Sequence, residues 1–223
     1  VLVGTTLEII CFTFEIPTGI VADLYSRRLS VIVGFLLIGI GFLIEGTFPF
    51  FGAILLTQVF WGIGATFTSG AIEAWVVDEV GEARMGQVFL RGSQVGQVGG
   101  VAGILLSVAL GSIGLALPVV IGAVIMLGLT VFLVAFMPET GFKPTPRGER
   151  STWQSMVETL RGSLRLVRIR PILGVFLAIS LVGGLYSEGF DRLWQAHLVQ
   201  EVTLPTLGAF QPVVWFGVIG IAG

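Results

Sequence analysis

The sequence predicts an all-α integral membrane protein, a bundle of about seven transmembrane helices, because it is too apolar for a water-soluble domain. The mean hydropathy is +0.97. Only 12% of the 223 residues are charged, whereas soluble globular domains have roughly 25%. Glycine is abundant, with 32 residues, which is typical of membrane helices that pack closely. Apolar runs of about 20 residues, the length that crosses a bilayer, recur along the chain.

Each apolar run predicts one helix. Five precede a polar stretch, at 1–22, 29–46, 51–77, 87–110 and 115–137, and two follow it, at 172–190 and 204–223. We therefore divide the chain into an N-terminal half with five helices at 1–137, a linker at 138–171 and the start of a C-terminal half at 172–223. Because the chain begins without methionine and both its ends lie inside apolar runs, we expect a fragment of a longer protein.

The basic residues indicate which connections face the cytoplasm. The connections 23–30 and 78–91 carry two basic residues each and the stretch 138–170 carries seven, so Arg192 is the only one of the 12 outside them. Basic residues gather in cytoplasmic loops of membrane proteins. We therefore predict that these three connections are cytoplasmic, in a multi-pass protein of the cell (plasma) membrane.

The polar stretch contains two kinds of sequence. Residues 138–150 have the proline, glycine and charge content of a linker. From Ser151 to Arg170, apolar residues recur at helical spacing, while Arg161, Arg165 and Arg168 fall largely on another face. This pattern predicts an amphipathic helix that lies on the cytoplasmic membrane surface.

A charged motif connects the first two runs. Gly19, Asp23, Arg27 and Arg28 stand at the spacing of the pattern G-x-x-x-D-x-x-G-R-R, with Ser26 in place of the second glycine. The sequence resembles the loop between the second and third helices of the major facilitator superfamily of secondary transporters. The resemblance covers essentially the whole chain, as family helices two to eight. It implies alternating access between two helical halves, without covalent chemistry.

The resemblance also implies a conformational latch made of Gly19, Asp23, Arg27, Arg28 and Asp78. Asp78 would pair with the arginines while the cytoplasmic side is closed, and the pair would break when that side opens. The alternative is a solvated loop with ordinary charges at helix ends.

A second family pattern is present in altered form in the third run. Gln58, followed by Gly62 and Gly64, is similar to a fourth-helix pattern of the family. Drug–proton exchangers have an arginine at the position of Gln58, and that arginine is implicated in proton coupling. We therefore expect no proton coupling by that route, and the glycines alone are also compatible with simple close packing.

A third pattern lies in the fourth run. Gly92, Gly96 and Gly100 are similar to the antiporter signature of the fifth family helix, with Gln97 in place of its proline. Their spacing places them on one face, which favours close helix packing. The resemblance therefore favours export over import, and the alternative is ordinary packing of small residues.

Several polar residues within apolar runs are candidates for the substrate and proton pathway, since such residues are costly in lipid. Glu8 and Glu15 share a helical face; Glu8 could bind a proton or a cationic substrate, and we expect Glu15 to join the cytoplasmic charges. The remaining candidates are Gln58, Glu188, Asp191, Arg192 and His197. The last four would line the outer half of a central cavity or, alternatively, form an exposed helix end.

Other function classes are disfavoured. Cys11 is the only cysteine and His197 the only histidine, so we expect neither an intrachain disulfide nor a metal site built from these residues. We find no hydrolase triad, phosphate-binding loop or basic stripe for nucleic acid in the sequence. We therefore expect no enzymatic activity and no cofactor.

The expected protein is a monomeric transporter in the lipid bilayer, with a small-molecule substrate and protons as the coupling ion. Proton-coupled efflux of amphipathic compounds or drugs is the favoured activity. A proton-coupled importer of a nutrient or metabolite is one alternative. A transport-inactive membrane sensor, which binds a ligand without moving it, is another.

Overall fold

A computed structural model describes residues 2–143, 161–162, 165, 167–170, 172–184, 194, 197 and 215. The chain divides into two compact units, one formed by Val1–Thr145 with Thr206–Gly223 and the other by Pro146–Pro205. In the described residues all regular structure is helical, which confirms the predicted all-α class. The two units are described separately below.

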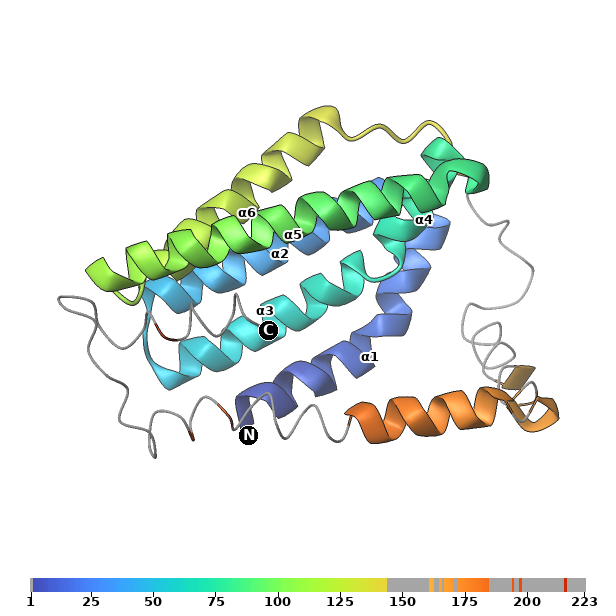
Figure 1. Cartoon of the computed structure of the whole chain (residues 1–223), viewed down its shortest axis with the longest axis horizontal. Coiled ribbons are helices and arrows are strands. Elements are labelled where there is room, and N and C mark those ends of the chain that lie inside the picture. The colour runs from blue at the N-terminus through green and yellow to red at the C-terminus, as the bar shows by residue number, and fades with distance from the viewer. Residues whose placement is uncertain are drawn as a thin grey trace. The chain divides into compact units, whose positions relative to one another are not determined.

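Residues 2–143 of the first unit form six helices (Figure 1). They are α1 (Leu2–Leu24), α2 (Arg27–Thr47), α3 (Phe51–Thr68), α4 (Ala71–Val80), α5 (Glu82–Ile113) and α6 (Leu117–Phe136). Among the described residues, four segments are long and apolar enough to cross a membrane: α2, Phe51–Val80, α5 and α6. Helix α1, which has 23 residues, is not among them.

Helix α2 is the centre of this unit. It packs against α3 on one side and α6 on the other, and α1 packs against α3. The α2–α3 contact depends on glycine, because a Cβ atom on Gly34 would lie 2.7 Å from the carbonyl oxygen of Gly64, and the reverse holds as well. Ser30, which is fully buried, donates a hydrogen bond to the carbonyl of Phe67 across the same contact. Small residues therefore let these two backbones meet closely.

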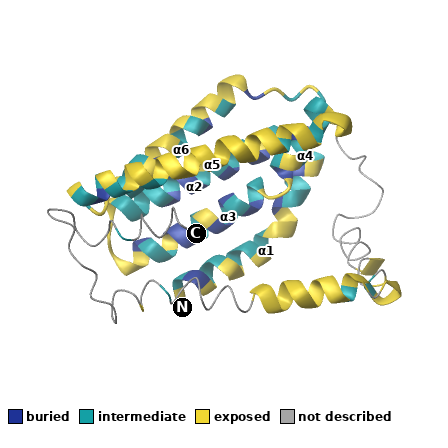
Figure 2. Cartoon of the chain, viewed as in Figure 1, coloured by how far each residue is buried: buried dark blue, intermediate teal, exposed yellow. Residues whose placement is uncertain are grey.

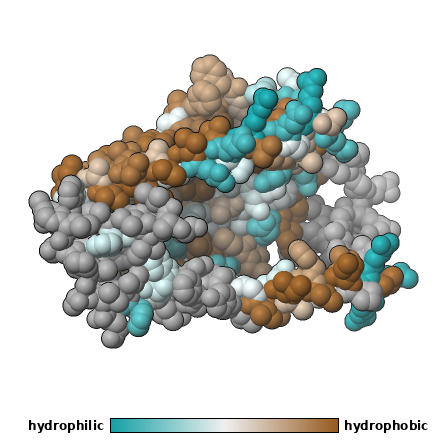
Figure 3. Space-filling view, viewed as in Figure 1, coloured by the Kyte–Doolittle hydropathy of each residue, from teal (hydrophilic) through white to brown (hydrophobic). Residues whose placement is uncertain are grey.

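Helix α5 is exposed along nearly all its length (Figure 2), and Gly111 is its only buried residue. On the face shown in Figure 3, hydrophobic side chains cover the C-terminal part of this helix and hydrophilic ones lie towards its N-terminal end. Exposed apolar side chains carry no penalty against lipid tails, which are equally apolar. This surface is consistent with the predicted membrane environment.

The third apolar run is not one helix, as the sequence predicted for 51–77. It is broken into α3 and α4 at Ser69 and Gly70. Ser69 has φ −57° and ψ 121°, and Gly70 has φ 69° and ψ −25°, which are the angles of a type II turn. The second central position of such a turn needs a positive φ, which glycine adopts without steric cost. The Ser-Gly dipeptide is a turn signal, but the apolar residues around it favour a continuous helix.

The predicted connections are shorter than expected. The connection at 23–30 consists of Tyr25 and Ser26, and that at 78–91 consists of Gly81 alone, because α5 begins at Glu82 and not near residue 87. Gly81 has φ 76° and ψ 157°, a conformation confined essentially to glycine. Arg84 and Arg91, predicted to lie in a loop, are therefore on α5.

In the second unit, a short apolar helix spans Ile172–Gly184, within the predicted run 172–190. Arg161, Arg165 and Arg168 are exposed helical residues, but most of the predicted amphipathic helix lies outside the described residues. The predicted seventh run, 204–223, most of which belongs to the first unit, also lies outside the described residues, apart from Trp215.

Candidate functional site

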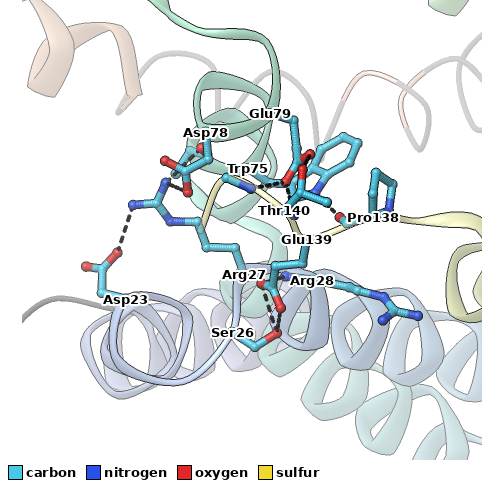
Figure 4. A network of polar contacts seen from close by, with 12 residues as sticks. Asp23, Ser26, Arg27, Arg28, Trp75, Asp78, Glu79, Pro138, Glu139 and Thr140 are labelled. Atoms are coloured by element: carbon cyan, nitrogen blue, oxygen red, sulfur yellow. Dashed lines mark hydrogen bonds and ion pairs between the residues drawn. The ribbon is translucent and has the colours of Figure 1, made fainter. Parts of the chain in front are cut away.

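Charged and polar side chains gather where α1, α2, α4 and the end of α6 meet (Figure 4). A small apolar core lies at this junction, formed by Ala22 of α1, Val31 of α2, Ala71 of α4 and Met137, which follows α6. Because the core brings these four segments together, it positions the polar residues around it.

Arg27, the first residue of α2, connects the α1–α2 turn to α4. Its Nη1 lies 2.5 Å from Oδ2 of Asp78 and donates a second hydrogen bond to the carbonyl of Ala74 at 2.8 Å. Its Nη2 lies 3.8 Å from Oδ1 of Asp23. The side chains of Arg27 and Asp78 are only 19% and 23% exposed, whereas that of Asp23 is 60% exposed. We call these three charged residues the turn cluster; within it, Asp78 is the closer and better shielded partner.

Arg28 does not join the turn cluster. Its Nη2 donates to the carbonyl of Val134, in the last turn of α6, at 2.5 Å. An arginine at this place satisfies a carbonyl that has no partner within its own helix. The two neighbouring arginines therefore bind different helices, Arg27 holding α4 and Arg28 holding α6.

Glu139 was missed by sequence reasoning, yet it sits at the start of α2. Its carboxylate accepts hydrogen bonds from the Ser26 hydroxyl at 2.8 Å and from the backbone N–H of Arg28 at 2.9 Å. Ser26 is also the N-cap of α2, since its oxygen accepts from the N–H of Leu29. A negative charge at a helix N-terminus is favoured by the free N–H groups and the helix dipole. Ser26, which replaces a motif glycine, thus connects α2 to Glu139.

The segment 137–142, of which residues 138–142 were predicted to begin a linker, is bound to α4. The carboxylate of Glu79 accepts hydrogen bonds from the Thr140 N–H at 2.6 Å, the Thr140 hydroxyl at 2.7 Å and the Gly141 N–H at 2.8 Å. The indole N–H of Trp75 donates to the carbonyl of Pro138 at 2.7 Å. Gly141 lies so close to α4 that a Cβ atom on it would overlap the carbonyl oxygen of Asp78. A tight contact of this kind fixes the segment over the end of α4.

The same segment also covers Arg27. The guanidinium carbon of Arg27 lies 5.8 Å from the centre of the Phe142 ring, within the range of a cation–π contact. The turn cluster and the segment 137–142 are therefore one connected assembly. No sequence signal identified Glu79, Glu139 or Phe142 as part of it, since their partners are distant in the chain.

The predicted pathway residues of the first unit lie elsewhere. Glu8 is exposed, and Glu15 accepts a hydrogen bond from the hydroxyl of Ser69 at 2.8 Å instead of joining the turn cluster. Gln58 is 5% exposed, and its side-chain amide donates to the carbonyl of Ile54 in its own helix. Gly19, which was predicted as part of the latch, lies one turn before Asp23 and has open space where a side chain would begin.

The three glycines of α5 that match the predicted signature have open space beside them in the described structure. A Cβ atom on Gly92, Gly96 or Gly100 would meet nothing within 4 Å. Their role in helix packing therefore stays a prediction, and it requires a partner other than the described helices.

The predicted residues of the second unit are mostly outside the described structure. Glu188, Asp191 and Arg192 lie outside the described residues, while His197 is described and is an exposed helical residue. Among the described residues, no three histidine, cysteine, aspartate or glutamate side chains are grouped so that they could hold a metal ion.

Comparison with known proteins places the chain in a family context. The model of the Major Facilitator Superfamily matches residues 2–223. An uncharacterized MFS-type transporter of Bacillus subtilis (strain 168), YxaM, is 26% identical over 203 residues, which cover 88% of this chain and 49% of that relative. The chain thus spans about half the length of the curated relative it matches. No solved structure matches it significantly.

Proposed function

Because the chain belongs to the major facilitator superfamily, we propose that it is part of a secondary transporter whose alternating access is controlled by the turn cluster. The observation that carries this proposal is the contact of Arg27 with Asp78, which joins the α1–α2 turn to α4. We propose that the contact is made when the cytoplasmic side is closed and broken when that side opens.

The geometry suits a latch with two stable arrangements. Both partners are largely shielded from water, so their attraction is stronger than that of an exposed ion pair. Once Arg27 and Asp78 separate, each charge regains water, which offsets part of the lost attraction. A partly buried pair at a helix junction can therefore hold one state without preventing the other.

Proton-coupled export of amphipathic compounds or drugs is the activity we propose first. It is supported by the glycine pattern of α5, whose exposed face is free to pack against other helices as they move. Import of a nutrient or metabolite is a second candidate. It is favoured by Gln58, a neutral and buried residue at the position where drug–proton exchangers carry arginine.

Transport in membrane vesicles tests the proposal. Inside-out vesicles from cells that produce the full-length protein are given a panel of dyes and antibiotics, with and without a proton gradient. Gradient-dependent accumulation, abolished by an uncoupler and absent from vesicles without the protein, would support export. Uptake of metabolites by right-side-out vesicles would support import. No movement of any compound in either orientation would favour the sensor.

A further inference from the structure

Helix α4 is bounded by two glycines with unusual backbone conformations. Gly70 precedes it with φ 69°, and Gly81 follows it with φ 76°. They are the only residues with positive φ in the described part of the chain. Apart from chain neighbours, neither has an atom within 4 Å of where a Cβ would lie, so there is open space beside both glycines. The ten residues between them form a short rigid body with a turn at each end.

This helix carries the side chains that hold the assembly described above. Trp75 and Glu79 bind the segment 137–142, and Asp78 binds Arg27. Any movement of α4 about its ends would therefore break all of these contacts together.

At the N-terminal end of α4, α1 holds the turn between α3 and α4. The carboxylate of Glu15 accepts a hydrogen bond from the hydroxyl of Ser69, the residue that directly precedes Gly70. One turn further along α1, the Thr18 hydroxyl lies 3.0 Å from the carbonyl of Thr66, still within α3, and 2.8 Å from the carbonyl of Phe14 in its own helix. Helix α1 thus contacts α3 through Thr18 and the turn itself through Glu15.

From these contacts we infer that α4 is a lever that swings about Gly70 and Gly81, and that the Glu15–Ser69 hydrogen bond holds it closed. Loss of this bond frees the turn at Gly70 and lets α4 leave the segment 137–142. The lever goes beyond the proposed transport function and does not depend on the substrate or its direction. It gives Glu15 a mechanical role in place of a role in the charge cluster.

A buried residue on α4 can report the movement. Val76 is 8% exposed, and cysteine is a small enough replacement to fit its place. The full-length Val76→Cys protein is reconstituted in nanodiscs, where both faces are accessible, and treated with a polar maleimide. Mass spectrometry of the peptide that carries residue 76 gives the rate of labelling.

The lever predicts that adding Ser69→Ala raises this rate about twofold, the factor that corresponds to the lower end of the range for one hydrogen bond, because this bond is exposed. Glu15→Ala should have the same effect, and the double variant should be no faster than either alone. Ser69→Thr, which keeps the hydroxyl, should label like the parent. Thr18→Val removes the neighbouring contact of α1 with α3 and is the matched control; it should leave the rate unchanged.

Two results would overturn the inference. One is an unchanged labelling rate in Ser69→Ala, because the bond would then hold nothing. The other is an equal increase in Thr18→Val, because this would indicate general loosening of α1 and not release of a hinge. Since labelling needs no substrate, neither result depends on the proposed transport activity.

Discussion

Arg27 and Asp78, 51 positions apart in the chain, form a largely shielded ion pair at 2.5 Å between the start of α2 and the end of α4. The same guanidinium donates to the carbonyl of Ala74 and lies near Asp23. One side chain therefore joins three helices. This use of several donors in a fixed fork distinguishes arginine from lysine.

Arg27→Lys should lower transport about tenfold, because a single ammonium cannot keep the charged contacts of the guanidinium. Transport is measured in vesicles and divided by protein abundance on an immunoblot. Arg28→Lys is the matched control: the contact of its side chain with the Val134 carbonyl needs only one donor. Equal activity of the two variants would contradict a special role for Arg27.

Ser26→Ala should lower the free energy of unfolding by about 1 kcal/mol, the usual cost of removing an N-cap. It also deprives Glu139 of a hydrogen-bond donor. Thermal unfolding in detergent measures the effect. Ser26→Thr keeps the hydroxyl and should leave the free energy of unfolding nearly unchanged. If Ser26→Thr destabilises the protein as much as Ser26→Ala, the hydroxyl does not provide the stabilisation.

Gly34→Ala should destabilise the protein by about 1–3 kcal/mol, because the new methyl group would collide with the backbone of α3. Gly128→Ala, in α6, is the control, since a Cβ there meets nothing within 4 Å and alanine favours a helix. Thermal unfolding of both variants in detergent measures the difference in stability. Equal melting temperatures of the two variants would contradict the predicted collision at Gly34.

Gly141→Ala should separate the segment 137–142 from α4, because the added methyl group would overlap the carbonyl of Asp78. The contacts of Glu79 with Thr140 and of Trp75 with Pro138 should be lost with it. Faster proteolysis between residues 137 and 145, at unchanged helix content, is the expected result. Thr140→Ser, which keeps the hydroxyl, should be cut at the parent's rate, and similar cutting of all three proteins would be evidence against the contact.

The sequence predicted α2 and α6 closely because apolar length alone determines them, whereas α5 begins five residues before its predicted run and the third run is broken into two helices. The boundaries of α2 and α6 differ from the predicted runs by two residues or fewer at each end. The position of the motif turn also follows from sequence, since Asp23 and the two arginines cannot lie in lipid without partners.

The break between α3 and α4 could not be predicted in the same way. Ser69 and Gly70 are embedded in a long apolar stretch, where hydropathy favours one uninterrupted helix. A Ser-Gly dipeptide is compatible with either structure, and only tertiary contacts such as that with Glu15 distinguish them.

The contribution of the segment 137–142 was hidden for a different reason. Glu139 binds residues more than 110 positions earlier, and local pattern carries no information about such contacts. The proline, glycine and charge content of the segment is typical of a linker. Glu15 was assigned to the charge cluster because it lies near the motif along α1, but its carboxylate contacts Ser69 instead.

The measurement that tests the central claim most directly compares the parent with Asp78→Asn in inside-out vesicles at equal protein abundance. The amide keeps the shape of the side chain but removes the charge that Arg27 binds. The latch predicts that gradient-driven accumulation of a transported dye falls about tenfold or more, as loss of a shielded charged contact implies. Accumulation equal to that of the parent would contradict it.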